Sequence, residues 1–90
     1  MNILYKKSFA GDLKRISDTS LKAKIEQAIS SVKKAVSQQD IPSLKKIKTG
    51  RNGNYYRIRV GDYRIGMSIE ADTVTFIVFG HRKDIYKSFP

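Results

Sequence analysis

The clearest pattern in the sequence is YYRIRVGDYRIGMSI, residues 55–69, which predicts a β-hairpin. Side chains alternate between the two faces of a strand with a period of two. Every second residue from Tyr56 to Val60 therefore falls on one face, where all are apolar or aromatic, whereas Arg57 and Arg59 share the other face. One face of this hairpin is expected to be core and the opposite face basic.

The turn of the hairpin is Gly61-Asp62, a two-residue connection with glycine first. Such a loop favours a tight turn whose first central residue has a positive φ, and it fixes the register of both strands. In that register the core face pairs apolar residues throughout, while Arg59 lies opposite Arg64 and Arg57 opposite Gly66. Like charges that face each other across a ladder are destabilising. An anionic partner is therefore expected on the basic face.

A further strand is predicted from Thr73 to Phe79, after a second turn at Ala71-Asp72. Continued alternation pairs Ile69 with Val74, Met67 with Phe76, Ile65 with Val78 and Arg64 with Phe79. On the basic face the same register sets Gly66 opposite Ile77. Because glycine has no side chain, this position predicts a shallow trough beside Arg57, in which a phosphate backbone could lie.

The N-terminal half predicts one strand followed by two helices. Residues 2–6, NILYK, alternate like a strand, and Ser8 is expected to cap a short helix. The apolar positions of this helix are Phe9, Leu13 and Ile16. A second helix is expected from Ser20 to Gln38. Its apolar stripe consists of Leu21, Ile25, Ala28, Ile29, Val32 and Val36. Two helices with a short connection are expected to form an antiparallel hairpin that lays its apolar side on a sheet.

A basic connector follows the helices, because Pro42 cannot continue a helix. Leu44 and Ile47 are its apolar anchors, its cations are Lys45, Lys46, Lys48 and Arg51, and Asn52-Gly53 marks a turn. These cations either follow the phosphates of a nucleic acid or belong to a solvated loop. The sequence pattern alone leaves both readings open.

The whole chain, residues 1–90, is expected to be a single α+β domain. Its predicted element order is β-α-α-β-β-β, with the N-terminal strand and the helical hairpin packed on one face of a mainly antiparallel sheet. The polar segment from His81 to Tyr86 is expected to turn back over the trough as a short C-terminal helix.

The charge balance points to an anionic partner. Eighteen Lys and Arg against eight Asp and Glu give a net charge of +10 over 90 residues, which suits nucleic acid, an anionic surface or an acidic protein. The sequence holds no cysteine, one histidine and no carboxylate cluster at metal-ligand spacing, so neither a metal centre nor another cofactor is expected. No apolar run is long enough for a signal peptide or a membrane span, and we therefore expect a cytoplasmic protein without a membrane partner.

The order of these elements, with the motifs YRIRVGDYRI at residues 56–65 and GHRKDIY at residues 80–86, resembles the RelE branch of the RelE/ParE toxin superfamily over essentially the whole chain. The resemblance implies the toxin of a type II toxin–antitoxin system, an endoribonuclease that cuts messenger RNA in the ribosomal A site and inhibits translation. Together with the net charge it implies a cognate acidic antitoxin, and no small-molecule substrate. The family's functional positions fall on Arg57, Arg59, Arg64, Arg82 and Tyr86. Members of the family often carry lysine at the first two of these positions.

Cleavage by the 2′-hydroxyl of RNA requires removal of its proton, neutralisation of charge on the phosphate, and protonation of the departing 5′-oxygen. Arginine serves the second need, because its planar fork matches phosphate oxygens, but it stays protonated and makes a poor base. Tyr86 and His81 are therefore the candidates for proton transfer, unless the ribosome or the RNA supplies the group. Histidine titrates near neutral pH, whereas a tyrosine in an ordinary environment would instead stack on a nucleobase and orient the reacting hydroxyl. The expected catalytic residues are Arg64, Arg82, Tyr86 and His81, and the expected RNA-binding residues are Arg57, Arg59, Lys45, Lys46, Lys48, Arg51 and Lys83.

Two other functions stay open on this scaffold. The ParE branch poisons DNA gyrase by protein contact, and there the arginine face need not be catalytic. The basic GHRKDIY segment argues against that branch. A module that binds RNA or a partner without cleaving it is the third possibility, since loss of a proton-transfer residue would leave the phosphate-binding face intact.

Overall fold

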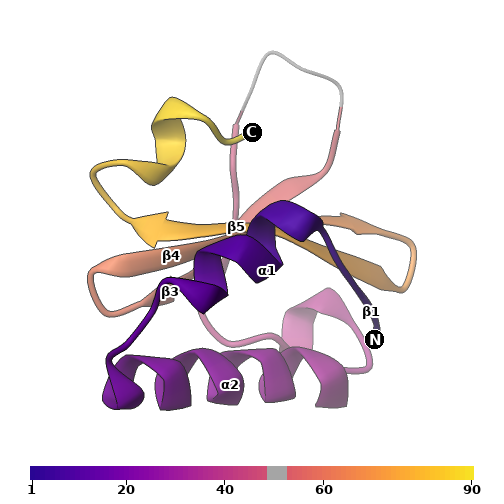
Figure 1. The fold of residues 1–90 in the computed structure, drawn as a ribbon. Helices are drawn as coiled ribbons and strands as arrows, with labels where there is room; N and C mark the ends of the chain where they lie inside the picture. Colours follow the sequence, from indigo (N-terminus) through magenta and orange to yellow (C-terminus); the bar gives the residue numbers. More distant parts are fainter. Residues whose placement is uncertain (49–52) are drawn as a thin grey trace.

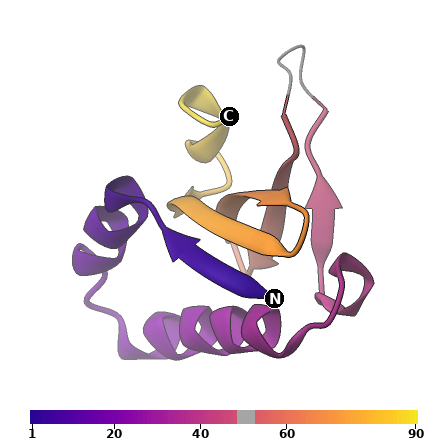
Figure 2. The ribbon, with the colours of Figure 1, turned by 90° about the vertical axis from the view of Figure 1, so that its right-hand side faces the viewer.

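A five-stranded sheet in the order β1-β5-β4-β3-β2 forms the centre of the fold (Figure 1). The structure is a computed structural model, and it describes residues 1–48 and 53–90. Its elements are β1 (Asn2–Tyr5), α1 (Lys7–Lys14), α2 (Thr19–Lys34), the 3-10 helix η1 (Gln38–Asp40), β2 (Leu44–Lys46), β3 (Tyr55–Val60), β4 (Tyr63–Glu70), β5 (Thr73–His81) and the 3-10 helix η2 (Ile85–Lys87). Figure 2 shows α2 on one side of the sheet and the C-terminal segment on the other. The expected α+β class and the short C-terminal helix are confirmed.

Both α-helices contribute to one hydrophobic core on the same face of the sheet. Phe9 of α1 stacks on Phe76 of β5, with 5.2 Å between ring centroids, and Ile25 and Val32 of α2 are buried in the same cluster. The sheet contributes Ile58, Val60, Ile65, Met67, Ile69, Val74, Phe76 and Phe79. The other face of the sheet, away from the two helices, is called the open face below.

The register of β3 and β4 is the predicted one. Arg59 lies opposite Arg64 and Arg57 opposite Gly66, with no irregularity along the pair. Gly61 in the turn has φ +60°, a conformation in which a side chain would be strained. The local pattern of residues 55–69 was therefore sufficient to specify this hairpin.

The register of β4 and β5 follows the prediction only as far as Met67 opposite Phe76. Beyond that pair Gly66 lies opposite Val78, so that Ile77 is an extra residue in β5 and forms a β-bulge. The predicted pairs Ile65 with Val78, Arg64 with Phe79 and Gly66 with Ile77 are wrong; the observed partners are Phe79 for Ile65 and Gly80 for Arg64. The extra residue reverses the faces of the strand from Val78 onward, and Phe79 turns into the core instead of onto the open face.

Side chains of α1 hold the bulge in place. β1 pairs in parallel with β5 only up to Phe76, and the chain then turns into α1. The hydroxyl of Ser8 donates to the carbonyl oxygen of Ile77, and a carboxylate oxygen of Asp12 accepts from the amide of Phe79 at 3.0 Å. Ser8 is therefore not the cap of α1; Lys6 occupies that position and makes no side-chain cap bond.

The second helix is shorter than predicted at its C-terminal end. Its cap is Asp18, whose carboxylate accepts from the amides of Ser20 and Leu21. It ends at Lys34 rather than Gln38, because the carboxylate of Asp40 takes the amides that a further turn would use, those of Val36 and Ser37. The placement of Val36 in the apolar stripe was accordingly wrong, since this residue is 87% exposed.

The basic connector contains a short edge strand that the sequence did not predict. In β2, Leu44 lies opposite Ile58, Lys45 opposite Arg57 and Lys46 opposite Tyr56. The expected turn at Asn52-Gly53 and the cation Arg51 fall wholly or partly outside the described residues. β2 extends the sheet next to the strand that carries Arg57 and Arg59.

Candidate functional site

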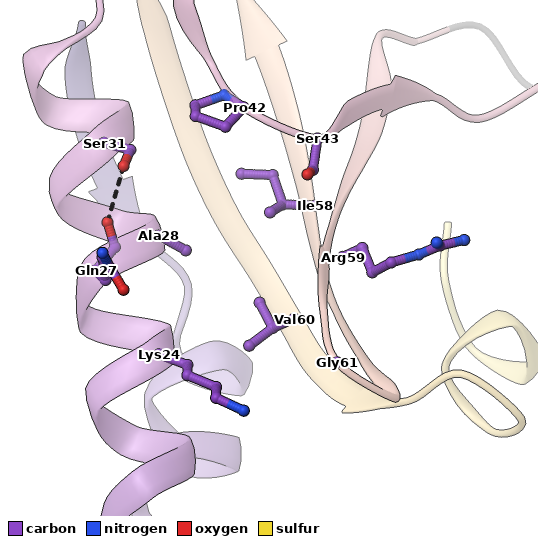
Figure 3. A pocket seen from close by; sticks show the side chains of 10 residues that line it. All are labelled: Lys24, Gln27, Ala28, Ser31, Pro42, Ser43, Ile58, Arg59, Val60 and Gly61. Carbon is purple, nitrogen blue, oxygen red and sulfur yellow. Dashed lines mark hydrogen bonds between the residues drawn. The ribbon is translucent and has the colours of Figure 1, made fainter.

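The arginines of the central hairpin lie on the open face. Figure 3 shows Arg59 directed away from α2, whereas its neighbours Ile58 and Val60 point toward that helix. Arg64 is the direct cross-strand partner of Arg59, and Arg57 lies two residues before Arg59 on β3. All three arginines therefore share one face of the sheet. The cavity of about 410 Å³ between α2 and the end of β3 in Figure 3 therefore lies on the other side of the sheet from the guanidinium of Arg59.

Arg64 differs from its partner in burial and bonding. It is 8% exposed, and its Nη1 donates to the carbonyl oxygens of Gly61 at 2.9 Å and Tyr63 at 2.8 Å. Arg59 is exposed. The two carbonyls satisfy part of the charge of Arg64 and thereby ease its repulsion with Arg59. The nitrogens Nε and Nη2 are the atoms through which Arg64 could also meet a phosphate.

The first residue of the GHRKDIY motif to leave the sheet is Arg82, and it is tied to the same turn. Its amide donates to the carbonyl oxygen of Asp62 at 2.8 Å, and its Nε lies 3.9 Å from a carboxylate oxygen of Asp62. Both side chains are more than half exposed, so this ion pair is weak. Arg64 and Arg82 thus both bond to residues of the turn that joins β3 to β4, and the structure brings them to one end of the hairpin.

His81 lies on the opposite face from the arginines. It pairs with Tyr63, and its ring meets the tyrosine edge-on with 5.4 Å between centroids. The amide of Lys83 donates to its Nδ1 at 3.2 Å, so neutral His81 carries its proton on Nε2. The bulge at Ile77 is the cause, because in a regular ladder of the same residues His81 would share the face of Arg64. The structure does not bring His81 together with the arginine cluster.

The lysines predicted to bind RNA divide between the two faces. Lys45 pairs with Arg57 and belongs to the open face, but Lys46 pairs with Tyr56 and belongs to the face of the helices. Lys48 is exposed beyond the end of β2, and Lys83 is exposed in the turn after β5. Arg51 is outside the described residues. Lys45 is therefore the connector lysine that the strand pairing places with the arginines.

The C-terminal segment folds back over the open face and fills the predicted trough. Phe89 is 3% exposed, and a Cβ added to Gly66 would come within 2.7 Å of its ring. The space above Gly66 is thus occupied by an aromatic side chain rather than free for a phosphate. Tyr86, in η2, remains 48% exposed. Phe89 was not among the residues predicted for the site, because a single apolar residue after a polar segment gives no periodic signal.

The described residues hold neither a cluster of metal ligands nor a membrane-spanning helix. Within residues 1–48 and 53–90, no three His, Asp or Glu side chains gather where they could hold a metal ion. In the same part of the chain no helix is long and apolar enough to cross a membrane. The site as described consists of arginines, a lysine and a tyrosine.

A family model described as "ParE toxin of type II toxin-antitoxin system, parDE" matches residues 3–86. The chain belongs to the RelE/ParE toxin superfamily. It is 41% identical to Toxin RelE3 of Methanocaldococcus jannaschii over 91 residues, which cover the whole of both sequences. This RelE/ParE chain is accordingly a toxin of a type II toxin–antitoxin system, and the resemblance seen in its sequence is confirmed.

Solved structures support the same RelE/ParE assignment. The chain is similar to a chain of the RelB–RelE antitoxin–toxin complex from Methanococcus jannaschii, with a TM-score of 0.73, 37% identity, and coverage of 97% of this chain and 99% of the other. It is also similar to a chain of the archaeal RelE–RelB complex from Pyrococcus horikoshii OT3, with a TM-score of 0.71, 14% identity, and coverage of 92% and 96%. At 14% identity this second similarity concerns the fold alone.

Proposed function

We propose that this toxin is a ribosome-dependent endoribonuclease that cleaves messenger RNA in the A site and so inhibits translation. The observation that carries the proposal is the open face of the sheet, where Arg57, Arg59 and Arg64 lie beside the C-terminal segment that begins at Arg82 and bears Tyr86. Similarity to Toxin RelE3 and to a RelB–RelE complex favours the RelE type of activity.

The proposed reaction is attack of a ribose 2′-oxygen on the adjacent phosphorus. A 2′-O–P bond forms, the bond from phosphorus to the 5′-oxygen breaks, the 2′-hydroxyl loses its proton and the departing 5′-oxygen gains one. Arg64 and Arg82 are proposed to lie closest to the charge that develops on the phosphate, and exposed Arg59 to bind the RNA beside them. The two carbonyls that accept from Nη1 fix the orientation of the Arg64 guanidinium.

Tyr86 is proposed to position the nucleotide. Its ring is about half exposed on η2, where it can stack on a base while its hydroxyl meets the ribose. His81 faces the other side of the sheet and accepts a backbone hydrogen bond at Nδ1, so proton transfer is assigned to Tyr86 or to a group of the ribosome. Arg57 and Lys45 are proposed to bind neighbouring phosphates, with Lys46, Lys48, Arg51 and Lys83 as outer cations of the RNA path.

A cognate antitoxin with an acidic segment is proposed as the partner that silences the toxin. The net charge of +10 and the arginines of the open face favour an acidic chain that folds on binding. The solved relatives at 37% and 14% identity are both RelB–RelE complexes. Coexpression with the small reading frame next to the toxin gene should restore growth and yield a complex. Failure of any neighbouring product to bind or to restore growth would count against this partner.

The test of the catalytic assignment is single-turnover cleavage of messenger RNA on a programmed ribosome. Arg82→Ala should lower the rate by about two to three orders of magnitude, as expected for loss of a donor to the developing charge. Arg64→Ala should lower it by a similar factor. Lys34→Ala removes an equal charge from the exposed end of α2 and should leave the rate unchanged. Full activity in either arginine variant would overturn the assignment.

Binding and chemistry should separate among the remaining residues. Arg57→Ala and Arg59→Ala should weaken the binding of RNA. Each should reduce the slope of log K against log salt concentration by about 1, the loss of one phosphate contact. Tyr86→Phe keeps the ring, so stacking should survive while any function of the hydroxyl is lost. Unchanged salt dependence in both arginine variants would show that these side chains do not contact phosphates.

Poisoning of DNA gyrase is the second candidate, favoured by the description of the matching family model as a ParE toxin. Cell-free translation and a supercoiling assay distinguish the two. Cut message with normal supercoiling supports the nuclease, whereas intact message with impaired supercoiling supports the gyrase poison. A protein with neither effect that still binds RNA or its antitoxin would be a module without catalytic activity.

A further inference from the structure

The C-terminal segment is anchored on the open face by a ring that sits in a socket. A Cβ built on Gly66 would lie 2.7 Å from Cε2 and 2.8 Å from Cδ2 of Phe89, and 2.8 Å from Cγ2 of Val78. Real Cβ atoms do not approach other atoms so closely, so glycine is required at this position for close approach rather than for its φ. Tyr55 forms a third wall, edge-on to the ring of Phe89 with 5.7 Å between centroids. We call Gly66, Val78 and Tyr55 the socket.

This ring is separate from the core under the helices. Ile85 and Phe89 are 4% and 3% exposed, yet neither belongs to the hydrophobic cluster that α1 and α2 form with the sheet. Ile85 instead lies over Gly80, where an added Cβ would be at an ordinary 3.8 Å from its own Cβ. The two apolar residues therefore hold the tail to the open face and contribute nothing to the main core.

Tyr86 is held between these two anchors. The amide of Phe89 donates to the carbonyl oxygen of Ile85 at 3.1 Å, and the amide of Lys87 donates to that of Asp84 at 3.1 Å, so the short 3-10 turn is closed on both sides of Tyr86. Ile85 and Phe89 are buried, whereas Tyr86 between them remains 48% exposed.

We propose that Phe89 is a positioning residue for Tyr86: seated in the socket, it fixes η2 on the open face and so directs the exposed tyrosine toward the nucleotide. This inference rests on the proposed function, in which Tyr86 contacts the RNA. Misplacement of a reacting group by about 1 Å can cost about a hundredfold in rate. Removal of the Phe89 ring from the socket should therefore slow the cleavage step more than it weakens binding to the ribosome, because the arginines contribute to binding.

The experiment compares Phe89→Ala, which removes the ring, and Gly66→Ala, whose added Cβ would displace it, with Gly80→Ala as the matched control on the same face. The first two variants should cleave ribosome-bound message about ten to a hundred times more slowly, with a Kd for the ribosome within about threefold of wild type. Hydrogen exchange at residues 85–89 should become faster in both. Gly80→Ala should retain wild-type cleavage and exchange, and Phe89→Leu should recover part of the rate.

A double-mutant cycle decides whether Phe89 acts through Tyr86. Phe89→Ala should cost little further rate in a Tyr86→Ala background. An equal loss in both backgrounds, or wild-type cleavage by Phe89→Ala, would overturn the inference while the proposed function stands. No cleavage by the wild-type toxin would overturn the proposed function and the inference with it. Unchanged hydrogen exchange at residues 85–89 in Phe89→Ala would show that the ring does not hold the tail.

Discussion

The two hairpins of the sheet share a strand and differ in how they are specified. The β3–β4 hairpin has glycine where its turn needs a positive φ, Gly61 at +60°, and a regular ladder. The β4–β5 hairpin has Ala71 at φ +52° and a bulge at Ile77. The first depends on residues that are close in sequence, whereas the second is shaped by α1, through bonds from Ser8 and Asp12. A hairpin can therefore be predicted from its own pattern only when no remote partner competes for its backbone.

The difference also decides which side chains can meet at the site. The regular hairpin places Arg59 and Arg64 opposite each other on the open face. The bulged hairpin places Gly80 beside Arg64 and His81 beside Tyr63, which puts the only histidine of the chain on the face of the helices. Bulges frequently redirect side chains next to functional sites.

Phe79→Ala should affect this contrast most strongly, because the bulge places Phe79 in the core. In a regular ladder that kept Ile77, Phe79 would lie on the open face, where its loss would cost little. Loss of a buried phenylalanine costs about 3–5 kcal/mol, out of roughly 5–15 kcal/mol for a whole domain. The free energy of unfolding in urea, followed by circular dichroism, should fall by that amount, whereas Ile77→Ala, at the partly exposed bulge position, should lower it much less. Equal losses in the two variants would contradict the placement of Phe79 in the core.

Asp12→Ala should have an intermediate effect, because it removes the partner of a partly buried amide in the bulged strand. An unsatisfied buried donor costs about 1–3 kcal/mol. The free energy of unfolding in urea should fall by that amount, and the amide of Phe79 should exchange faster. Glu26→Ala, at an exposed position of α2, is the control. Equal stability of the two variants would mean that α1 does not hold the bulge.

The two turns offer the smallest and most direct comparison. Gly61→Ala should destabilise by about 1 kcal/mol, since alanine is strained at a positive φ. Ala71→Gly should stabilise by up to about 1 kcal/mol, because it relieves the same strain, less the entropy that glycine loses on folding. Thermal unfolding measures both. Changes of the same sign in the two variants would contradict the assignment of strain to Ala71.

The sequence predicted the class of the fold, the central hairpin and the basic face, because each follows from residues within a few positions of one another. The end of α2 was also within reach, since Asp40 lies close enough to take the amides of Val36 and Ser37. The bulge at Ile77 was not, because its partners in α1 lie 69 and 67 residues away along the chain. The same holds for the candidate site. The face of the sheet that carries the arginines was predicted correctly, whereas the face that carries His81 depended on the bulge.

Phe89 was beyond sequence reasoning for a related reason. The trough at Gly66 was predicted from the missing side chain, but which group would fill it depends on the path of the tail. An apolar residue near a chain end gives no periodic pattern to interpret. Burial of Phe89 becomes visible only when the strands and the tail are placed together in space.

The parallel pairing of β1 with β5 bears on when the toxin can fold. Asn2 lies opposite Thr73, so the first strand to be synthesised must wait for the last before it finds its place in the sheet. Contacts between segments so distant in sequence are slow to form and carry a large loop-closure cost. We therefore expect that the growing chain cannot complete the sheet, or assemble the arginines of the open face, until β5 has left the ribosome.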